Sequence, residues 1–427
     1  MKPAAPLSLS VGSRWLIVVL LMGYAALAHF NRVGISVAGS EVFIRHYGIS
    51  KTDMGWVYTA FLIAYTLGML PGGWLIDRIG SSRSLALLGF SMGSFVVLTG
   101  ALGWVLTDAA TLWLGLLVIR SLAGLCSTTL HPGAAHVVSD VTHGRGRATA
   151  NGLVTGGALI GIACCYPIFG WLMDKLTWPW AFVVSGLALI SYGMIWTMLA
   201  VPLLPGPKAE APTLDEPAPA PSAMAAARLL VHKDLWLLTL SYAAFGYFQY
   251  LFFYWMNNYF ADVLKVPDVE SRRVSFYIAL SQGAGMAIGG LAADVACRLL
   301  GTTPGRRSIV ITGMGLSAVF ALIATQLNDY QQVAIFFALA MGIQGICEGV
   351  FWTTSTDIGG RSRGFAAAFM NTGGNLGGLI SPVLTPAMAK HIGWPGAIAV
   401  ACAISVVGAL LWFCINPAAT QERNSSR

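Results

Sequence analysis

Charged side chains are scarce in this sequence. Asp, Glu, Lys and Arg make up only 10% of its 427 residues, whereas a typical soluble domain contains about 25%. So few charges could not cover the surface of a soluble protein of this length. The 56% share of hydrophobic residues also excludes an intrinsically disordered chain, which needs low hydrophobicity and high charge. The sequence therefore predicts a membrane protein.

The patterns of several other functions are missing as well. There is no long basic run, so we interpret the net charge of +7 as Lys and Arg of cytoplasmic loops and expect no nucleic-acid partner. The seven cysteines form no CxxC pair and lie mostly in apolar runs, which favours small buried side chains over a disulfide framework. Because no nucleotide-binding loop is present either, we expect no cofactor and no enzymatic activity.

Long apolar runs are abundant instead. A helix needs about 20 mainly apolar residues to cross a bilayer, and these runs are continuous, unlike the alternating strands of a barrel. The predicted fold class is an all-α polytopic membrane protein with twelve transmembrane helices. The expected spans are residues 14–38, 53–76, 83–106, 112–136, 148–173 and 179–203 in the first half and 234–260, 273–296, 308–327, 331–356, 364–389 and 395–416 in the second.

A polar stretch rich in proline and alanine separates the first six spans from the last six. We predict an N-terminal six-helix bundle (1–204), a cytoplasmic linker (205–233) and a C-terminal six-helix bundle (234–427). Most of the 25 Lys and Arg residues fall on the side of the linker and of both termini. By the positive-inside rule we expect both termini in the cytoplasm, with the chain in the inner membrane.

The two halves of the chain repeat each other. Gly73-Trp-Leu-Ile-Asp77 is echoed by Gly290-Leu-Ala-Ala-Asp294, and Thr155-Gly-Gly is echoed by Thr372-Gly-Gly, both at an offset of 217 residues. An offset that spans six helices preserves the membrane orientation of each repeat. Such parallel repeats are typical of transporters whose halves are related by an axis along the membrane normal.

The loop between the second and third spans has the pattern Gly73-x-Leu75-x-Asp77-Arg78-x-Gly80-x-x-Arg83. It resembles the signature loop of the major facilitator superfamily, and Asp294 repeats it loosely in the second half. The resemblance implies the major facilitator fold, in which two six-helix bundles surround a central cavity. We expect a cytoplasmic gate formed by Asp77, Arg78, Arg83 and Asp294.

Two arginines lie inside predicted spans, Arg32 in the first and Arg120 in the fourth. A charge at the centre of a bilayer costs about 3 kcal/mol or more, so such residues usually face a cavity and have a role. No Asp or Glu of the first half lies at a similar depth. Because a guanidinium holds a carboxylate through two parallel hydrogen bonds, the two arginines predict a small organic anion as the substrate.

The sequence around these arginines resembles a particular transporter family. Asn31-Arg32-Val-Gly-Ile-Ser-Val-Ala, Arg120-Ser-Leu-Ala-Gly124 and Asn371-Thr-Gly-Gly-Asn-Leu-Gly-Gly378 are similar to the first, fourth and eleventh helices of the anion:cation symporter family. That family includes bacterial galactonate, glucarate and hexuronate transporters, animal sialin and the vesicular glutamate transporters. The resemblance implies substrate contacts from Arg32, Tyr65, Arg120, Trp352 and Asn371.

The usual proton carriers of that family are missing. Its proton-coupled bacterial members have an aspartate where this chain has Asn31 and a glutamate where it has Ser127. His131 and Glu348 correspond to each other at the 217-residue offset, so we consider them, with Asn31, as candidates for coupling. Symport with protons, symport with another cation and uncoupled transport all stay open.

The seventh span is rich in aromatic residues. Tyr247, Tyr250 and Tyr254 lie on one helical face, where their hydroxyls could bind the polyol of a sugar acid. From this span we take Gln249 and Tyr250 as candidate substrate contacts. An interfacial aromatic belt is an equal explanation.

We predict a secondary transporter of a sugar acid or another small carboxylate that works by alternating access in a lipid bilayer, with protons as partners if it is a symporter. Three alternatives are kept. A metal-ion or metal-chelate transporter would use His29, His131, Glu348, Cys126 and Cys347, although no pair has ligand spacing and we assign no metal ligands. An exporter of apolar drugs would tolerate loss of Arg120. A transporter-like membrane sensor would bind its ligand without transporting it.

Overall fold

The structure is a computed structural model that describes residues 10–141, 146–204, 229–359 and 363–416. Within these ranges the side chains of residues 70, 77, 139, 146–149 and 363–364 are excluded from the description. The predicted linker, 205–233, therefore falls almost entirely outside the described residues. Every regular element in the described ranges is a helix, which confirms the predicted fold class. The chain divides into two compact units, Met1–Ala211 and Pro212–Arg427.

Six long helical segments make up the described part of the first unit. They are α1 (Val11–Ala38, followed by a π-helical turn at Gly39–Phe43), α2 (Lys51–Ile79), α3 (Ser81–Val105), α4 with α5 (Ala109–Cys126 and Leu130–Val141), α6 (Gly146–Leu176) and α7 (Trp178–Leu199). Side-chain caps start α2 and α4, where Ser50 and Asp108 accept hydrogen bonds from backbone amides of the first turn. At α4, the hydrogen bonds from Thr111 hold the pKa of the exposed Asp108 carboxyl below its usual value.

The second unit is built from five helical elements in its described part. They are α9 (Lys233–Asn258, followed by a π-helical turn at Tyr259–Val263), α10 (Asp268–Leu300), α11 (Thr302–Ala324), α12 (Tyr330–Gly359) and α13 (Arg363–Leu410). α13 consists of two helices that meet at Gly393, whose φ of 73° lies in the left-handed region that favours glycine. Buried apolar side chains such as Phe245, Phe351 and Trp412 form the interior of this unit.

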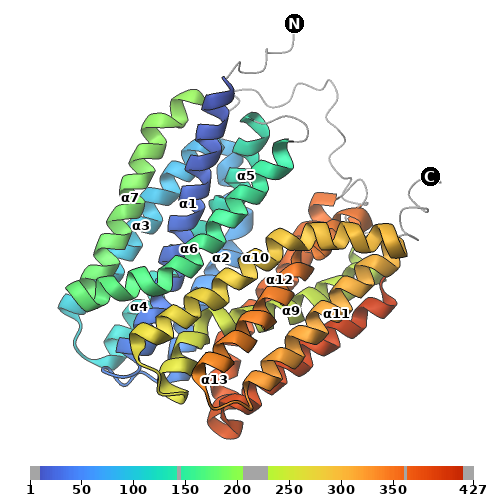
Figure 1. Cartoon of the computed structure of the whole chain (residues 1–427). Helices are drawn as coiled ribbons and strands as arrows, with labels where there is room; N and C mark the ends of the chain where they lie inside the picture. Colours follow the sequence, from blue (N-terminus) through green and yellow to red (C-terminus); the bar gives the residue numbers. More distant parts are fainter. Residues whose placement is uncertain (1–9, 142–145, 205–228, 360–362, 417–427) are drawn as a thin grey trace, which may run out of the picture. The chain divides into compact units, whose positions relative to one another are not determined.

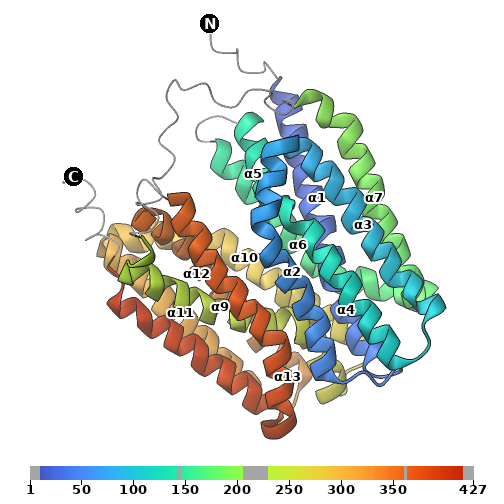
Figure 2. The same ribbon diagram turned by 180° about the vertical axis from the view of Figure 1, so that it is seen from behind.

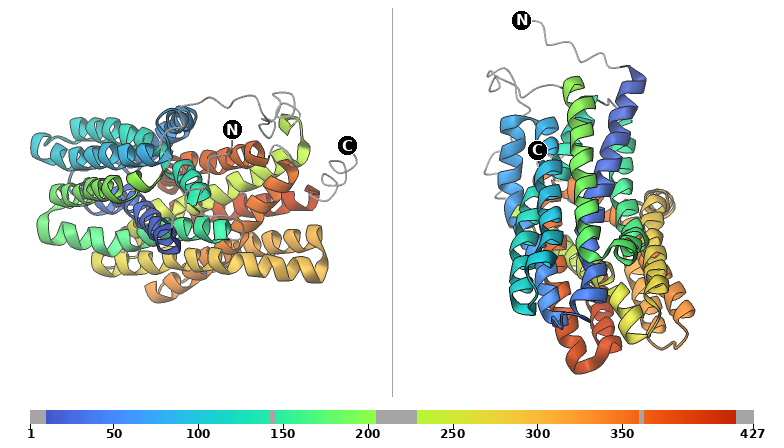
Figure 3. Two further views of the ribbon diagram at one scale, coloured as in Figure 1. Left: turned by 90° about the horizontal axis from the view of Figure 1, so that it is seen from above. Right: turned by 90° about the vertical axis from the view of Figure 1, so that its left-hand side faces the viewer.

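The helices pair in the same way in both units (Figures 1 and 2). In the first unit, α1 packs against α6, α2 against α4, and α3 against α7, while α1 and α7 also run side by side (Figure 3). In the second unit, α9 packs against α13, α10 against α12, and α11 against α13. These pairs correspond to one another at the sequence offset of the two halves, so the internal repeat is also a structural repeat.

Glycines bring the paired helix backbones together. A Cβ atom on Gly161 of α6 would lie 2.0 Å from the carbonyl oxygen of Ala26 on α1. A Cβ atom on Gly377 of α13 would lie 2.1 Å from the carbonyl oxygen of Ala243 on α9. No side chain fits at such distances, so these glycines allow equivalent close contacts inside each unit.

Nine helices of the described ranges are long and apolar enough to cross a membrane, against the twelve spans that we predict. The difference has two causes. α13 counts once although it contains two helices, and α2 and α9 are not among the nine. The tyrosines of α9 lower the mean hydropathy of that helix, and α2 contains residues 70 and 77, whose side chains lie outside the description. With these helices counted, the described units contain the twelve long helices of the predicted fold.

The predicted span 112–136 corresponds to one membrane-crossing segment, Ala109–Val138, but its α-helix is interrupted. α4 ends at Cys126, a 3-10 turn (η2, Ser127–Thr129) follows, and α5 begins at Leu130. The apolar run continues through this break, which is why hydropathy alone does not reveal it.

Proline explains the break. Pro132 has no N–H to donate to the carbonyl of Thr128, and its ring would crowd that carbonyl in a straight helix. The hydroxyls of Ser127 and Thr128 donate to the carbonyls of Gly124 (2.7 Å) and Leu125 (3.0 Å), so they satisfy backbone acceptors at the end of α4. The α-helix is therefore interrupted by the 3-10 turn at Ser127–Thr129, and α5 continues the same span.

Candidate functional site

A small pocket lies inside the first unit. Its lining residues come from α1, α2, α3, η2 and α5 and are Ala28, His29, Arg32, Phe61, Tyr65, Met92, Ser127, Leu130 and His131. The pocket brings together the predicted substrate residues Arg32 and Tyr65 with the coupling candidate His131. Within the described residues no Asp or Glu lines it, so the guanidinium of Arg32 is its one permanent charge.

Helical spacing places these side chains in the pocket. His29 and Arg32 are three residues apart on α1, and Phe61 and Tyr65 are four residues apart on α2, so each pair lies on one helix face. Ser127 in the 3-10 turn adds a hydroxyl to the pocket, and His131 in α5 adds an imidazole.

Arg32 is half-buried and lies over two aromatic rings of α2. Its guanidinium carbon is 5.5 Å from the ring centroid of Phe61 and 5.9 Å from that of Tyr65. Such cation–π contacts stabilise a guanidinium in apolar surroundings. The sequence of α2 thus helps to position the permanent charge of the pocket.

Arg120 is buried more deeply, with 1% of its surface exposed. Its Nη1 donates to the Asn31 carbonyl (3.2 Å) and its Nη2 to the Arg32 carbonyl (2.7 Å), while the guanidinium lies over the Phe61 ring at 4.9 Å. Arg120 therefore braces the backbone of α1 next to Arg32 and is not one of the lining residues. Direct contact between Arg120 and the substrate stays a prediction.

Asn31 is directed towards α7. Its Nδ2 donates to the carbonyls of Leu27 (2.9 Å) and Ser185 (3.3 Å), and 1% of its surface is exposed. An aspartate in this place would bring a negative oxygen against two carbonyl oxygens, so the local structure suits an amide. A coupling role for Asn31 stays a prediction.

The two histidines of the pocket touch each other. The ring centroids of His29 and His131 are 5.2 Å apart with an interplanar angle of 65°. Nδ1 of His29 lies 3.0 Å from the Ala25 carbonyl, which can only accept, so Nδ1 carries a hydrogen and Nε2 is the acceptor of the neutral ring. The sequence marks His29 as an intramembrane residue that could carry a proton or bind a metal ion, and does not assign it to the substrate residues. Its spacing from Arg32 was the signal that it shares a site with that residue.

A second cluster surrounds Glu348 in the second unit. The Tyr242 hydroxyl (2.6 Å) and the Trp352 indole N–H (2.9 Å) both donate to Oε1 of Glu348. Oε2 has no hydrogen-bond partner among the described residues. The rings of Tyr242 and Trp352 meet edge to face, 6.3 Å between centroids. A hydrogen bond thus joins Trp352 to Glu348. Tyr242 belongs to the same cluster, and the sequence analysis did not single it out although it lies in the aromatic seventh span.

The other predicted residues of the second unit are half-buried. Gln249 and Tyr250 lie on α9, and Asn371 lies on α13. A Cβ atom on Gly378 of α13 would lie 2.9 Å from the Tyr250 ring, so that glycine makes room for the ring. Substrate contacts by these three residues, and the juxtaposition of Glu348 with His131, stay predictions.

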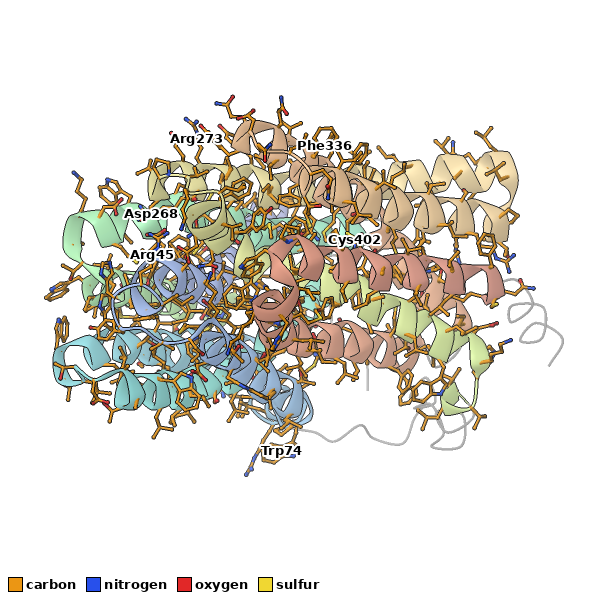
Figure 4. All side chains as sticks on the ribbon, turned by 90° about the horizontal axis from the view of Figure 1, so that it is seen from below. Arg45, Trp74, Asp268, Arg273, Phe336 and Cys402 are labelled. Atoms are coloured by element: carbon orange, nitrogen blue, oxygen red, sulfur yellow. The ribbon has the colours of Figure 1, made fainter. Side chains whose placement is uncertain are left out.

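The residues of the predicted gate lie at helix ends. Arg78 is exposed and its guanidinium lies 5.1 Å from the ring of Trp74, which projects from α2 (Figure 4). Arg83 and Asp294 are exposed as well, and the side chain of Asp77 lies outside the described residues. A gating role for these four residues stays a prediction.

A metal site finds no geometric support. In the part of the chain that the structure describes, no group of three or more His, Cys, Asp or Glu side chains could hold a metal ion. The pair of His29 and His131 could offer two nitrogen ligands, and no third His, Cys, Asp or Glu of the described residues joins them.

Comparison with known proteins identifies the family. The profile of the Major Facilitator Superfamily matches residues 21–304 and 295–427. A bacterial homologue of the human lysosomal transporter Spinster, solved in an inward-facing and unoccupied conformation, superposes with a TM-score of 0.77 at 17% identity, covering 97% of this chain and 99% of that one. The chain belongs to the major facilitator superfamily. It is an integral membrane transporter with the major facilitator fold, and not an enzyme.

Sequence relatives include transporters of small anions. The D-galactonate transporter of Escherichia coli O6:H1 is 26% identical over 423 residues, which cover 94% of this chain and 95% of the relative. A probable sulfoacetate transporter of Cupriavidus necator is 26% identical over 413 residues, covering 93% and 92%. These relatives confirm the resemblance to the anion:cation symporter family.

Proposed function

We propose that this protein transports a small organic anion, a sugar acid or another carboxylate, by alternating access. The observation that carries the proposal is the pocket of the first unit, where Arg32 is the one permanent charge and no described Asp or Glu is present. A positive pocket in an apolar protein interior favours an anion. The relatives named for D-galactonate and sulfoacetate support the same class of substrate.

Arg32 would bind the carboxylate with its planar fork of N–H donors, held over Phe61 and Tyr65. Arg120 would hold the backbone of α1 in place through its hydrogen bond to the Arg32 carbonyl, and its charge would make the potential behind the site more positive. Hydroxyls of Tyr65 and Ser127 would hydrogen-bond the remaining polar groups of the substrate. We keep Gln249, Tyr250, Trp352 and Asn371 as proposed substrate contacts from the second unit.

The proposed setting is the inner membrane of a bacterial cell, with both termini in the cytoplasm. Asp77, Arg78, Arg83 and Asp294 would form the cytoplasmic gate that closes and opens as the two bundles rock.

Uptake into proteoliposomes tests the proposal. Labelled D-galactonate, D-glucarate and sulfoacetate are offered to the wild type, to Arg32→Gln and to a control, His136→Gln, which changes an exposed residue of α5. Loss of a charge-assisted hydrogen-bonded pair is worth about 1.5–3 kcal/mol, so Arg32→Gln should lower uptake at low anion concentration by about tenfold or more.

The control variant should transport like the wild type, and uncharged D-galactose should not compete. Equal uptake by Arg32→Gln and the wild type would contradict the proposed role of the pocket. Absence of uptake of every anion by the wild type would contradict the proposed function itself.

A further inference from the structure

We propose that His29 and His131 together form the proton-binding site of this transporter, so that binding of the anion at Arg32 is accompanied by uptake of a proton on the histidine pair. The inference rests on the anion transport proposed above and adds a co-transported ion to it. The two rings come from α1 and α5, lie 5.2 Å apart, and line the same pocket as Arg32.

The geometry identifies the atom that receives the proton. Because Nδ1–H of His29 donates to the Ala25 carbonyl at 3.0 Å, the lone pair of the neutral ring is on Nε2. A proton from water adds to that lone pair and no bond of the protein breaks. His131 provides a second imidazole in contact with the first, so one proton can be held by either ring. Imidazole is the side chain whose ordinary titration range lies nearest to neutral pH.

The surrounding groups couple the proton to the anion. Facing the pair are the guanidinium of Arg32 on α1, the phenol of Tyr65 on α2 and the hydroxyl of Ser127 on η2, while Met92 is the lining residue of α3. Arg120 of α4 lies behind the Arg32 carbonyl. Within the described residues no carboxylate lines the pocket to offset these positive charges.

A proton on either histidine would therefore add a second positive charge beside Arg32. In the empty pocket this charge repels the guanidinium. A bound carboxylate cancels the repulsion, so the anion favours the protonated pair. By thermodynamic linkage, the proton strengthens anion binding by the same factor that the anion strengthens proton binding.

The remaining polar groups of the site do not titrate in this range. The Asn31 amide is held by carbonyls of α1 and α7, and the Ser127 hydroxyl donates to the Gly124 carbonyl. Glu348 belongs to the other unit and is held by Tyr242 and Trp352. The histidine pair is thus the titratable group that shares a pocket with the anion-binding guanidinium.

The test measures anion affinity and proton uptake with purified protein, using whichever of D-galactonate, D-glucarate or sulfoacetate the wild type transports. His29→Asn removes the titratable ring but keeps an N–H for the Ala25 carbonyl. It is combined with His131→Gln. His136→Gln is the matched control on the same helix as His131, and Glu348→Gln tests the competing carrier.

For the wild type we expect proton uptake on anion binding in weakly buffered solution, and about tenfold weaker binding near pH 8 than near pH 5.5. The double variant should bind the anion with an affinity independent of pH and without proton uptake. It should still exchange labelled for unlabelled anion across a liposome membrane, which shows that it is folded. His136→Gln should behave like the wild type, and Glu348→Gln should still take up a proton on anion binding.

Proton uptake that persists in the double variant would overturn the inference, as would loss of proton uptake in Glu348→Gln alone. Anion binding by the wild type without any proton uptake would also overturn it, and would leave the proposed anion transport standing. Failure of the wild type to bind any anion would instead contradict the proposed function, and the inference with it.

Discussion

At the scale of single residues, two arginines of one unit differ in what holds them. Arg120 spans from α4 to two carbonyls of α1, and Arg32 lies over two rings and lines the pocket. From the sequence alone, both are charges inside predicted spans, Arg32 in the first and Arg120 in the fourth. The hydrogen bonds of Arg120 show that it braces α1, and the place of Arg32 in the pocket supports the proposal that it binds the anion.

This difference predicts different effects on stability. Arg120→Ala removes a fully buried side chain, leaves a cavity against Phe61 and deprives two carbonyls of charged donors. We expect it to lower the free energy of unfolding by about 2 kcal/mol or more. Arg32→Ala should cost less, because that side chain is half-buried. Denaturation of the two purified variants measures the difference, and an equal or larger loss in Arg32→Ala would contradict the assignment.

At the scale of elements, the break between α4 and α5 decides which side chains reach the pocket. Pro132→Ala would restore the missing N–H and allow a straighter helix. We expect anion affinity to fall by about tenfold or more, because Ser127 and His131 would leave the pocket, while the protein stays folded.

The matched control is Pro167→Ala, which changes a proline inside α6 that does not line the pocket. Equilibrium binding of the transported anion to both variants checks the prediction. Wild-type affinity in Pro132→Ala would show that the break does not position the site.

The turn between α6 and α7 contains a strained residue. Thr177 has φ 80° and ψ 158°, a conformation that is essentially restricted to glycine, and the equivalent turn of the second unit has Gly393 at φ 73°. Thr177→Gly should raise the free energy of unfolding by about 1 kcal/mol, since relief of about 1–3 kcal/mol of strain exceeds the entropic cost of a glycine. The reverse change, Gly393→Thr, should destabilise. A lower unfolding midpoint for Thr177→Gly would contradict this account.

At the scale of the whole molecule, the sequence was enough to predict the all-α class, the number of helices and the family. Hydropathy, the 217-residue repeat and the loop around Asp77 can all be read from the order of the residues. Continuous apolar stretches of this length form helices in a bilayer, because a helix satisfies all of its own backbone hydrogen bonds. The 3-10 turn at Ser127–Thr129 was not predicted because the apolar residues on both sides of it extend the span across it.

The candidate site was less predictable. Sequence could place Arg32, Tyr65 and His131 within membrane spans, but only the packed structure shows that they line one pocket. The contact between His29 and His131 joins α1 to α5, and the hydrogen bond between Tyr242 and Glu348 joins residues 106 positions apart. Such contacts follow from tertiary packing, which no local pattern encodes.

Topology gives a separate prediction for the whole chain. If both termini are cytoplasmic, alkaline phosphatase fused to the C-terminus should be inactive, and the same enzyme fused at Leu106, between α3 and α4, should be active. The expectation follows from the excess of Lys and Arg on the other side of the membrane. The opposite pattern of activities would reverse the proposed orientation and place the predicted gate outside.

The most direct test of the central claim is the equilibrium affinity of the transported anion for the wild type and for Arg32→Gln, measured on purified protein at a fixed pH. Binding through a charge-assisted pair predicts that the variant binds about tenfold more weakly or worse, with His136→Gln unchanged. An affinity of Arg32→Gln equal to that of the wild type would contradict the claim that the pocket of the first unit holds the anion.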